Sequence, residues 1–329
     1  MRDLTALPKA ELHLHLLGAM RPVTLDELAA EAGLTAPDPR GFTTFAEFQM
    51  VFQAAFEVTL TRPQNLARLV REVVADAAAD GVVWILPHFD PHVFPHFGPP
   101  EQVLELVLEA GREEGARLGV GFGLTMAAQR HRGPQAAENL ARFAGRYAGQ
   151  GVHAFGLTGD EVAFPCEPFA EAFAIARGAG LTAAPHAGEL SGPQSVRAAV
   201  AALGAQRIAH GVRAADDHAV LSLLAERMTS LDVCLTSNRI LGVVPDISQH
   251  PLPRLLAAGV RCSLGADDPL MFGAGLLDEY RTARTALGLS DHQLAAIART
   301  SIDTSDAPAS LIRAASARID DWLAFSGKG

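Results

Sequence analysis

Two short segments at opposite ends of the chain carry the residue types of one metal site. His13 and His15 stand two residues apart near the start, and Asp267 and Asp268 are neighbours near the end. On an extended strand, side chains at i and i+2 point to the same face, so both imidazoles are expected to project together. One aspartate can then bind the metal while the other handles protons. The intervening residues must form a fold that brings the two segments together.

Further polar residues with suitable chemistry fall at or near the ends of predicted strands. They are His186 and Glu189, which share one short segment, and His210. Three imidazoles and one carboxylate suit zinc or a similar divalent ion with one position left for water. Such a water can lose its proton near neutral pH. We expect Glu189 to exchange protons with a substrate, and His210 and Asp268 to orient and deprotonate the water.

The elements that must position these residues alternate between strand and helix patterns. Short apolar runs predict strands near 11–16, 81–86, 119–126, 152–157, 181–186, 207–210, 230–235 and 260–266. Helical periodicity covers 64–79, 101–117, 136–148, 167–179, 192–203 and 216–226. This order predicts an α/β fold, a single (β/α)8 TIM barrel whose functional residues gather at the C-terminal ends of its strands. An open, doubly wound sheet is the alternative, but no GxGxxG follows the first strand.

We expect one domain over residues 1–329, with a helical insertion after the first strand. Residues 24–60 carry this extra helical pattern and are expected to lie over the barrel mouth. The segment is rich in phenylalanine, with Phe42, Phe45, Phe48, Phe52 and Phe56. An ordinary packed helical pair is the alternative interpretation.

Composition limits the class of protein and its partners. The net charge of -10 and the lack of a basic run argue against a nucleic-acid surface. Three cysteines without a CxxC pair suggest neither a disulfide framework nor a thiolate zinc site. No apolar signal region or membrane-length apolar run is present, so we expect a cytoplasmic protein acting on a small molecule. The oligomeric state stays open, and a homo-oligomer is compatible with the sequence.

The remaining histidines are given other roles. His88, His92 and His96 follow the second predicted strand, and their spacing raises the alternative of a second metal. The prolines between them argue against the helix that would align them, which favours pocket lining. Five others are expected to be structural or exposed: His131, His153, His218, His250 and His292.

With these residues and the motifs around them, the sequence resembles the adenosine deaminase family of the amidohydrolase superfamily. The matching motifs run in order along nearly the whole chain, at 8–15, 159–161, 186–189, 210–211, 236–238 and 267–269. HxH alone would be a weak signal, and all of these motifs in this order are a highly specific one.

The resemblance implies a (β/α)8 barrel with one Zn²⁺ per chain, bound by His13, His15, His186 and Asp267. It implies Glu189 as the proton donor to purine N1, and His210 with Asp268 as the groups that orient and activate the hydroxide. Gly159 matches the glycine whose amide meets purine N3, and Asp268 is implied at N7. The reaction would replace the 6-amino group and release ammonia.

Lysine usage excludes a related type of site. Many amidohydrolases bridge two metals with a carboxylated lysine on strand four. Here the lysines are Lys9, before the first predicted strand, and Lys328, near the C-terminus. A mononuclear site is therefore expected. The PCxxC pair of cytidine-deaminase-type sites is also absent.

One departure from the family pattern concerns the substrate. Adenosine deaminases carry Asp, and adenine deaminases often Glu, where this chain has Leu17. An apolar residue binds a ribose 5′-hydroxyl poorly, which favours a purine nucleoside with an apolar or aryl 5′ group. Aminodeoxyfutalosine deaminases of menaquinone synthesis are such a branch. The segment 86–91 also departs from the family pattern. Residues expected at the substrate are His15, Leu17, Gly159 and Asp268.

Three hypotheses about function follow. The first is a zinc-dependent deaminase acting at C6 of a 6-aminopurine nucleoside, with aminodeoxyfutalosine or free adenine as alternative substrates. The second is a metal-dependent hydrolase of an amide or ester bond, which ammonia release would distinguish. The third is a non-catalytic binding protein on a degenerate barrel, which would show lost ligand residues.

Overall fold

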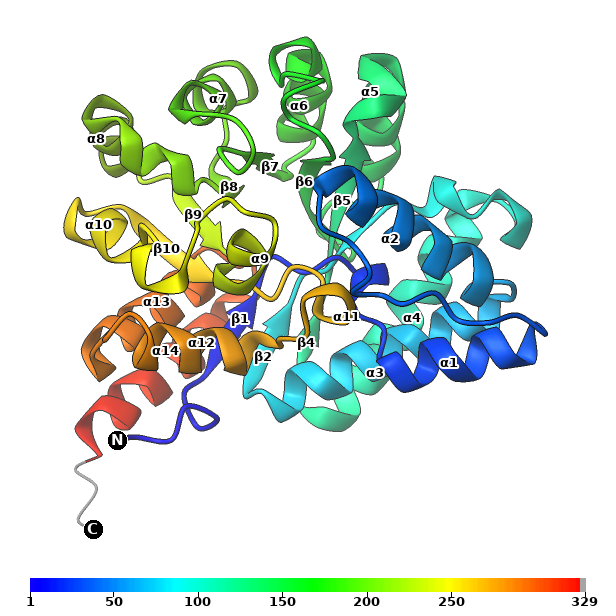
Figure 1. Cartoon of the computed structure of the whole chain (residues 1–329), viewed down its shortest axis with the longest axis horizontal. Coiled ribbons are helices and arrows are strands. Elements are labelled where there is room, and N and C mark those ends of the chain that lie inside the picture. Colours follow the sequence, from blue (N-terminus) through cyan, green and yellow to red (C-terminus); the bar gives the residue numbers. More distant parts are fainter. Residues whose placement is uncertain (326–329) are drawn as a thin grey trace.

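The structure is a computed structural model that describes residues 1–325, and its strands form a ring enclosed by helices (Figure 1). Every strand pairing in this part of the chain is parallel. The strands are β1 (Lys9–Glu11), β2 (Val82–Ile85), β3 (His88–Phe89), β4 (Gly121–Phe122), β5 (Leu124–Gln129), β6 (Val152–Thr158), β7 (Thr182–Ala187), β8 (Arg207–His210), β9 (Ser230–Val233) and β10 (Arg261–Leu264). The predicted α/β fold with parallel strands is confirmed.

The strands fall into two hydrogen-bonded sets, ordered β1-β2-β4 and β10-β9-β8-β7-β6-β5-β3. The second and third predicted strands are each split in two, at 86–87 and at Gly123. Backbone bonds join the ends of the two sets. Asp267 donates its N–H to the carbonyl of His13, and His15 donates to the carbonyl of Asp267, each at 2.9 Å. The segment after β1 is thereby bonded to the residues after β10.

Helices follow most strands and cover the outside of the ring. They are α1 (Pro22–Glu31), α2 (Phe45–Thr59), α3 (Pro63–Ala79), α4 (Pro100–Leu118), α5 (Gly133–Gly145), α6 (Ala170–Gly178), α7 (Pro193–Ala198), α8 (His218–Arg227), α9 (Leu235–Ile240), α10 (Leu252–Ala257), α11 (Pro269–Phe272), α12 (Leu276–Thr285), α13 (Asp291–Asp303) and α14 (Ala309–Ala324). Proline begins several of them, where its missing N–H costs nothing. In α3 the apolar stripe Leu66, Leu69, Val70 and Val73 is buried.

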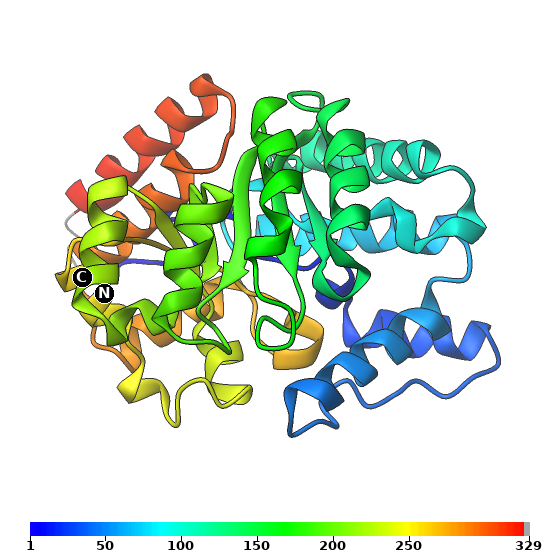
Figure 2. The same ribbon diagram turned by 90° about the horizontal axis from the view of Figure 1, so that it is seen from above.

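Two helices occupy the predicted insertion. Figure 2 shows α1 and α2 at one side of the ring, away from the helices that follow the later strands. Thr44 caps α2 through a capping box with Glu47, which fixes where the helix begins. Within residues 1–325, no helix combines the length and apolar character needed to cross a bilayer.

Candidate active site

A cavity of about 800 Å³ opens at the C-terminal ends of the strands. Its lining includes residues at or next to the ends of consecutive strands: Gln129, Gly159, His186 and His210. This is the end of a parallel α/β barrel where loops bring side chains from several strands together. The polar residues singled out from the sequence meet here.

Four potential metal donors converge at the base of this cavity. The Nε2 atoms of His13 and His15 lie 3.1 and 3.2 Å from Nε2 of His186. Asp267 Oδ1 lies 3.5 and 3.4 Å from the Nε2 atoms of His13 and His15. All four donor atoms lie within 4.8 Å of one another. His13 and His15 follow β1 in an irregular segment, outside a regular strand, yet both rings point to the same centre.

The surroundings of the histidine donors suit metal binding. His13 Nδ1 donates to the carbonyl of Asp232 at 2.8 Å, which leaves Nε2 as the nitrogen that faces the other donors. Burial lowers the pKa of His15 to about 4 and that of His186 well below its ordinary value. Neutral imidazoles and a carboxylate are the donors a divalent ion such as zinc requires, so these residues fit such an ion. The Asp232 carbonyl was not predicted, because any residue offers one.

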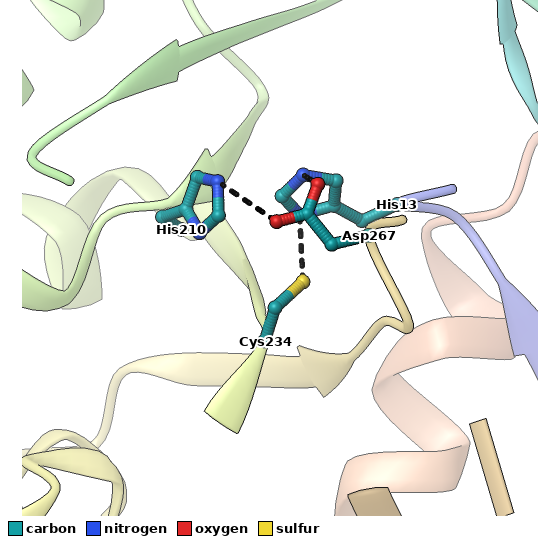
Figure 3. A group of neighbouring side chains, drawn as sticks. All are labelled: His13, His210, Cys234 and Asp267. Atoms are coloured by element: carbon teal, nitrogen blue, oxygen red, sulfur yellow. Dashed lines mark hydrogen bonds and ion pairs between the residues drawn. The ribbon is translucent and has the colours of Figure 1, made fainter. Parts of the chain in front are cut away.

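A second group of side chains shares two of these residues (Figure 3). Cys234 Sγ lies 3.2 Å from His13 Nδ1, and His210 Nε2 lies 3.8 Å from Asp267 Oδ2. Burial raises the pKa of the Cys234 thiol well above its ordinary value, so it is not the thiolate that metals bind. The group with His15 and His186 therefore fits a metal better.

Glu189 stands beside the four donors as a buried acid. Its Oε2 lies 3.5 Å from His210 Nε2. Burial raises the pKa of Glu189 well above its ordinary value, and the negative charge of Asp267 adds to this. Both effects favour the protonated form of Glu189, which is the form that can donate a proton.

The loop that carries Glu189 is held by the carboxylate of Glu161. This carboxylate accepts the backbone N–H groups of residues 188–191 and the hydroxyl of Ser195. Arg130 holds the preceding residue, because it donates to the carbonyl of His186 at 2.6 Å. Glu161 belongs to a recognised motif, but neither it nor Arg130 was assigned a role from the sequence. Both side chains bind main-chain groups, which every residue has, so these contacts leave no pattern of residue types in the sequence.

Asp268 lies next to the donors and is buried, with 3% of the residue exposed. Its Oδ1 atom has no hydrogen-bond partner. Burial raises its pKa well above the ordinary value, and the neighbouring Asp267 reinforces the shift. His210 and Asp267 both adopt positive φ, 63° and 60°. Such strain in non-glycine residues is typical of functional sites, where the surrounding structure maintains it.

The predicted substrate residues all line the cavity. They are His15, Leu17, Gly159 and Asp268. Helix α2 adds four phenylalanines to the lining: Phe45, Phe48, Phe52 and Phe56. Phe42 instead packs on Phe48 and Phe272, with ring centroids 5.4 and 6.2 Å apart.

Two histidines, His92 and His131, differ from their predicted roles. His88 and His96 line the cavity as expected, whereas His92 pairs with Asp90 at 2.9 Å. His131, predicted as structural or exposed, also lines the cavity, because residues after β5 turn towards it. Lys9 Nζ donates to the carbonyls of Leu4 and Asp80, so it is committed elsewhere. Lys328 lies outside the described residues.

Comparison with known proteins agrees with this arrangement. A "Putative adenosine/adenine deaminase" of Streptomyces coelicolor is 42% identical, with 98% of each chain covered. An "Aminodeoxyfutalosine deaminase" of Acidothermus cellulolyticus is 35% identical over 84% of this chain and 82% of its own. The solved adenine deaminase of Arthrobacter aurescens has a TM-score of 0.89 at 28% identity, covering 97% of this chain and 99% of its own. An amidohydrolase from Burkholderia ambifaria, solved with bound Zn, has a TM-score of 0.85 at 25% identity, covering 98% and 93%.

The parallel barrel and its cluster of histidine and carboxylate donors define a metal-dependent amidohydrolase. The family model of adenosine deaminase matches residues 8–322. The chain belongs to the adenosine deaminase family, whose members deaminate purine-type substrates.

Proposed function

We propose that this protein is a zinc-dependent deaminase acting at C6 of a 6-aminopurine nucleoside. The observation that carries the proposal is the convergence of four metal donors beside the buried carboxyl of Glu189. His13, His15, His186 and Asp267 would hold one zinc ion per chain, and the zinc-bound relative of the same fold supports that identity. When bound, zinc supplies a water that loses its proton near neutral pH.

The protein's own residues would divide the remaining work. Glu189, whose pKa is raised by burial, would donate its proton to N1 of the purine as C6 is attacked. Asp268 would contact N7 and, with His210, align the attacking oxygen. Gly159, whose φ of 100° turns its backbone at the end of β6, would offer its amide to N3. The net reaction consumes one water, leaves a 6-oxopurine and releases ammonia.

A nucleoside with an apolar or aryl 5′ group is the substrate we favour within this class. Leu17 lines the cavity at the position where the resemblance to adenosine and adenine deaminases implies a carboxylate, and the four phenylalanines of α2 extend the apolar wall. A free base would leave much of the cavity empty, since pockets of roughly 300–1,000 Å³ hold drug-sized ligands. Aminodeoxyfutalosine, the substrate that one relative's name gives, has this character.

A deamination panel tests both levels of the proposal. Protein loaded with one equivalent of zinc would be assayed for ammonia release from adenosine, 5′-deoxyadenosine, adenine and aminodeoxyfutalosine. We expect kcat/KM to be higher for the 5′-modified nucleosides than for adenosine. A strong preference for adenosine would overturn the argument from Leu17. Inactivity on all four, with hydrolysis of amides or esters instead, would overturn the deaminase proposal.

Gly18 offers a structural test of the position of Asp268. A Cβ added to Gly18 would lie 1.7 Å from Asp268 Oδ1, so the carboxyl must move. Because misplacing a catalytic group by about 1 Å can cost about 100-fold, we expect Gly18→Ala to lower kcat by about that factor. Steady-state kinetics together with metal analysis would check this, since the zinc content should not change. Gly178→Ala is the matched control, because a Cβ there meets nothing within 4 Å. Unchanged turnover in Gly18→Ala would show that Asp268 tolerates displacement.

A further inference from the structure

Three buried polar side chains form a row that leads away from the cavity, starting at His210. Asn238, in α9, lies behind it, and His250, just before α10, lies behind Asn238. His210, Asn238 and His250 are 1%, 0% and 3% exposed. Asn238 Nδ2 lies 3.1 Å from His210 Nδ1, and Asn238 Oδ1 lies 3.1 Å from His250 Nε2. None of the roles described so far uses Asn238 or His250.

The direction of each hydrogen bond in this row follows from its far end. The backbone N–H of Leu252 lies 3.1 Å from His250 Nδ1, and a backbone N–H can only donate. His250 Nδ1 is therefore the acceptor, and the neutral ring carries its proton on Nε2. Burial lowers the pKa of His250 to about 4, so the ring is neutral at pH 7.

The same reasoning continues to His210. His250 Nε2–H donates to an oxygen, so the Asn238 oxygen faces His250 and its NH2 group faces His210. An amide NH2 is only a donor, so His210 Nδ1 must accept. An imidazolium donates at both ring nitrogens, so a ring that accepts from the Asn238 amide at Nδ1 is the neutral form. A neutral imidazole that accepts at Nδ1 carries its proton on Nε2.

We propose that Asn238 and His250 are positioning residues that fix this tautomer of His210, with Nε2–H aimed into the active site. The inference rests on the proposed deaminase function for its catalytic meaning. His210 Nε2 lies 3.5 Å from Glu189 Oε2 and 3.8 Å from Asp267 Oδ2, beside the position that an attacking oxygen would reach.

The tautomer decides what His210 does in the reaction. A nitrogen that already carries a proton cannot remove one from water at the same atom. His210 therefore donates a hydrogen bond to the attacking oxygen and aligns it, and deprotonation of the water must fall to a group other than His210. This revises the expectation that His210 and Asp268 share deprotonation. Fixed donors aimed at developing negative charge are among the strongest contributions to catalysis.

The tautomer can be read directly by NMR, without substrate. In zinc-loaded protein labelled with 15N-histidine, long-range 1H–15N correlations distinguish a protonated from an unprotonated ring nitrogen. The His210 signals are assigned by their loss in His210→Gln. We expect Nδ1 unprotonated and Nε2 protonated in the wild type. In Asn238→Asp the carboxylate accepts only, so we expect a proton on Nδ1. A wild-type His210 protonated on Nδ1 alone, or a tautomer unchanged in Asn238→Asp, would overturn the proposal.

Kinetics on His250 variants provide the second arm. His250→Leu removes the donor to Asn238 Oδ1, whereas the amide of His250→Gln can replace it. We expect kcat about 100-fold lower in the Leu variant, with KM nearly unchanged, and substantial recovery in the Gln variant. Equal losses in both variants would indicate packing alone and contradict the proposal. His292→Gln, at an exposed position of α13, is the control.

The two proposals fail in distinguishable ways. If no purine is deaminated but His210 shows the expected nitrogen signals, the positioning row stands and the proposed function is wrong. If deamination is normal but the tautomer is reversed, the function stands and the positioning row is wrong.

Discussion

Glu189→Gln is expected to lower kcat for deamination by about 1,000-fold while the protein keeps its zinc. Glutamine fills the same space but has no acidic proton, and transfer by a positioned acid is worth about 100- to 10,000-fold. The raised pKa of Glu189, caused first by burial and then by Asp267, favours the protonated carboxyl that this role needs. Rapid-quench or spectrophotometric assays would measure the loss, and metal analysis would follow the zinc content.

The control for this variant is Glu167→Gln, an exposed glutamate before α6. It changes the same functional group without touching the cavity, so its kcat should match the wild type. If Glu189→Gln retained more than about a tenth of the activity, another group would have to supply the proton to N1. If it lost zinc as well, Glu189 would belong to the metal site, and its assignment as an acid would be wrong.

Glu161→Ala should lower the free energy of unfolding by about 3–5 kcal/mol. The carboxylate accepts four successive backbone N–H groups from 188–191. Removing it leaves donors without an acceptor, each costing about 1–3 kcal/mol unless water reaches it. Turnover should fall as well, because the same bonds place Glu189. Denaturant unfolding, monitored by circular dichroism, would measure the stability change.

Asp160→Ala is the matched control, one residue earlier in the chain. Asp160 also accepts two backbone N–H groups, from Val162 and Ala163, but these bonds lie in an exposed turn. Water can replace the lost acceptor there, so a loss of about 1 kcal/mol or less is expected. Equal losses in the two variants would contradict the view that burial makes Glu161 important.

The strands could be predicted because buried parallel strands appear as short apolar runs between turns. The runs near 207–210 and 260–266 match β8 and β10 to within a few residues. The predicted helices end with 216–226, and α9 to α14 were missed. Helices α9 to α11 have six residues or fewer, too short for a periodic signal, and α14 buries only Ala315, Ile319 and Trp322. The capping box of Ser290 and Gln293 was an unused signal for α13.

The residues proposed to bind metal and to transfer protons could be named because histidine and carboxylate at strand ends are unusual side chains there. The residues that support these side chains could not be named from the sequence. Arg130 reaches the carbonyl of His186 from 56 positions away, and the Asp232 carbonyl that orients His13 is a main-chain atom. Such contacts depend on three-dimensional proximity and leave no pattern in the residue types. For the same reason His250 looked like an ordinary structural histidine.

The backbone bonds between His13, His15 and Asp267 also constrain the order of events during synthesis. The segment after β1 is hydrogen-bonded to residues far along the chain, since Asp267 lies 254 positions after His13. A nascent chain that has not yet exposed Asp267 to solvent outside the ribosome can form internal βα units, but it lacks this pairing. Contacts of such long sequence separation form late and slowly. The complete set of donors therefore arises only when the two ends of the ring meet, and a truncated or stalled chain would have no active site.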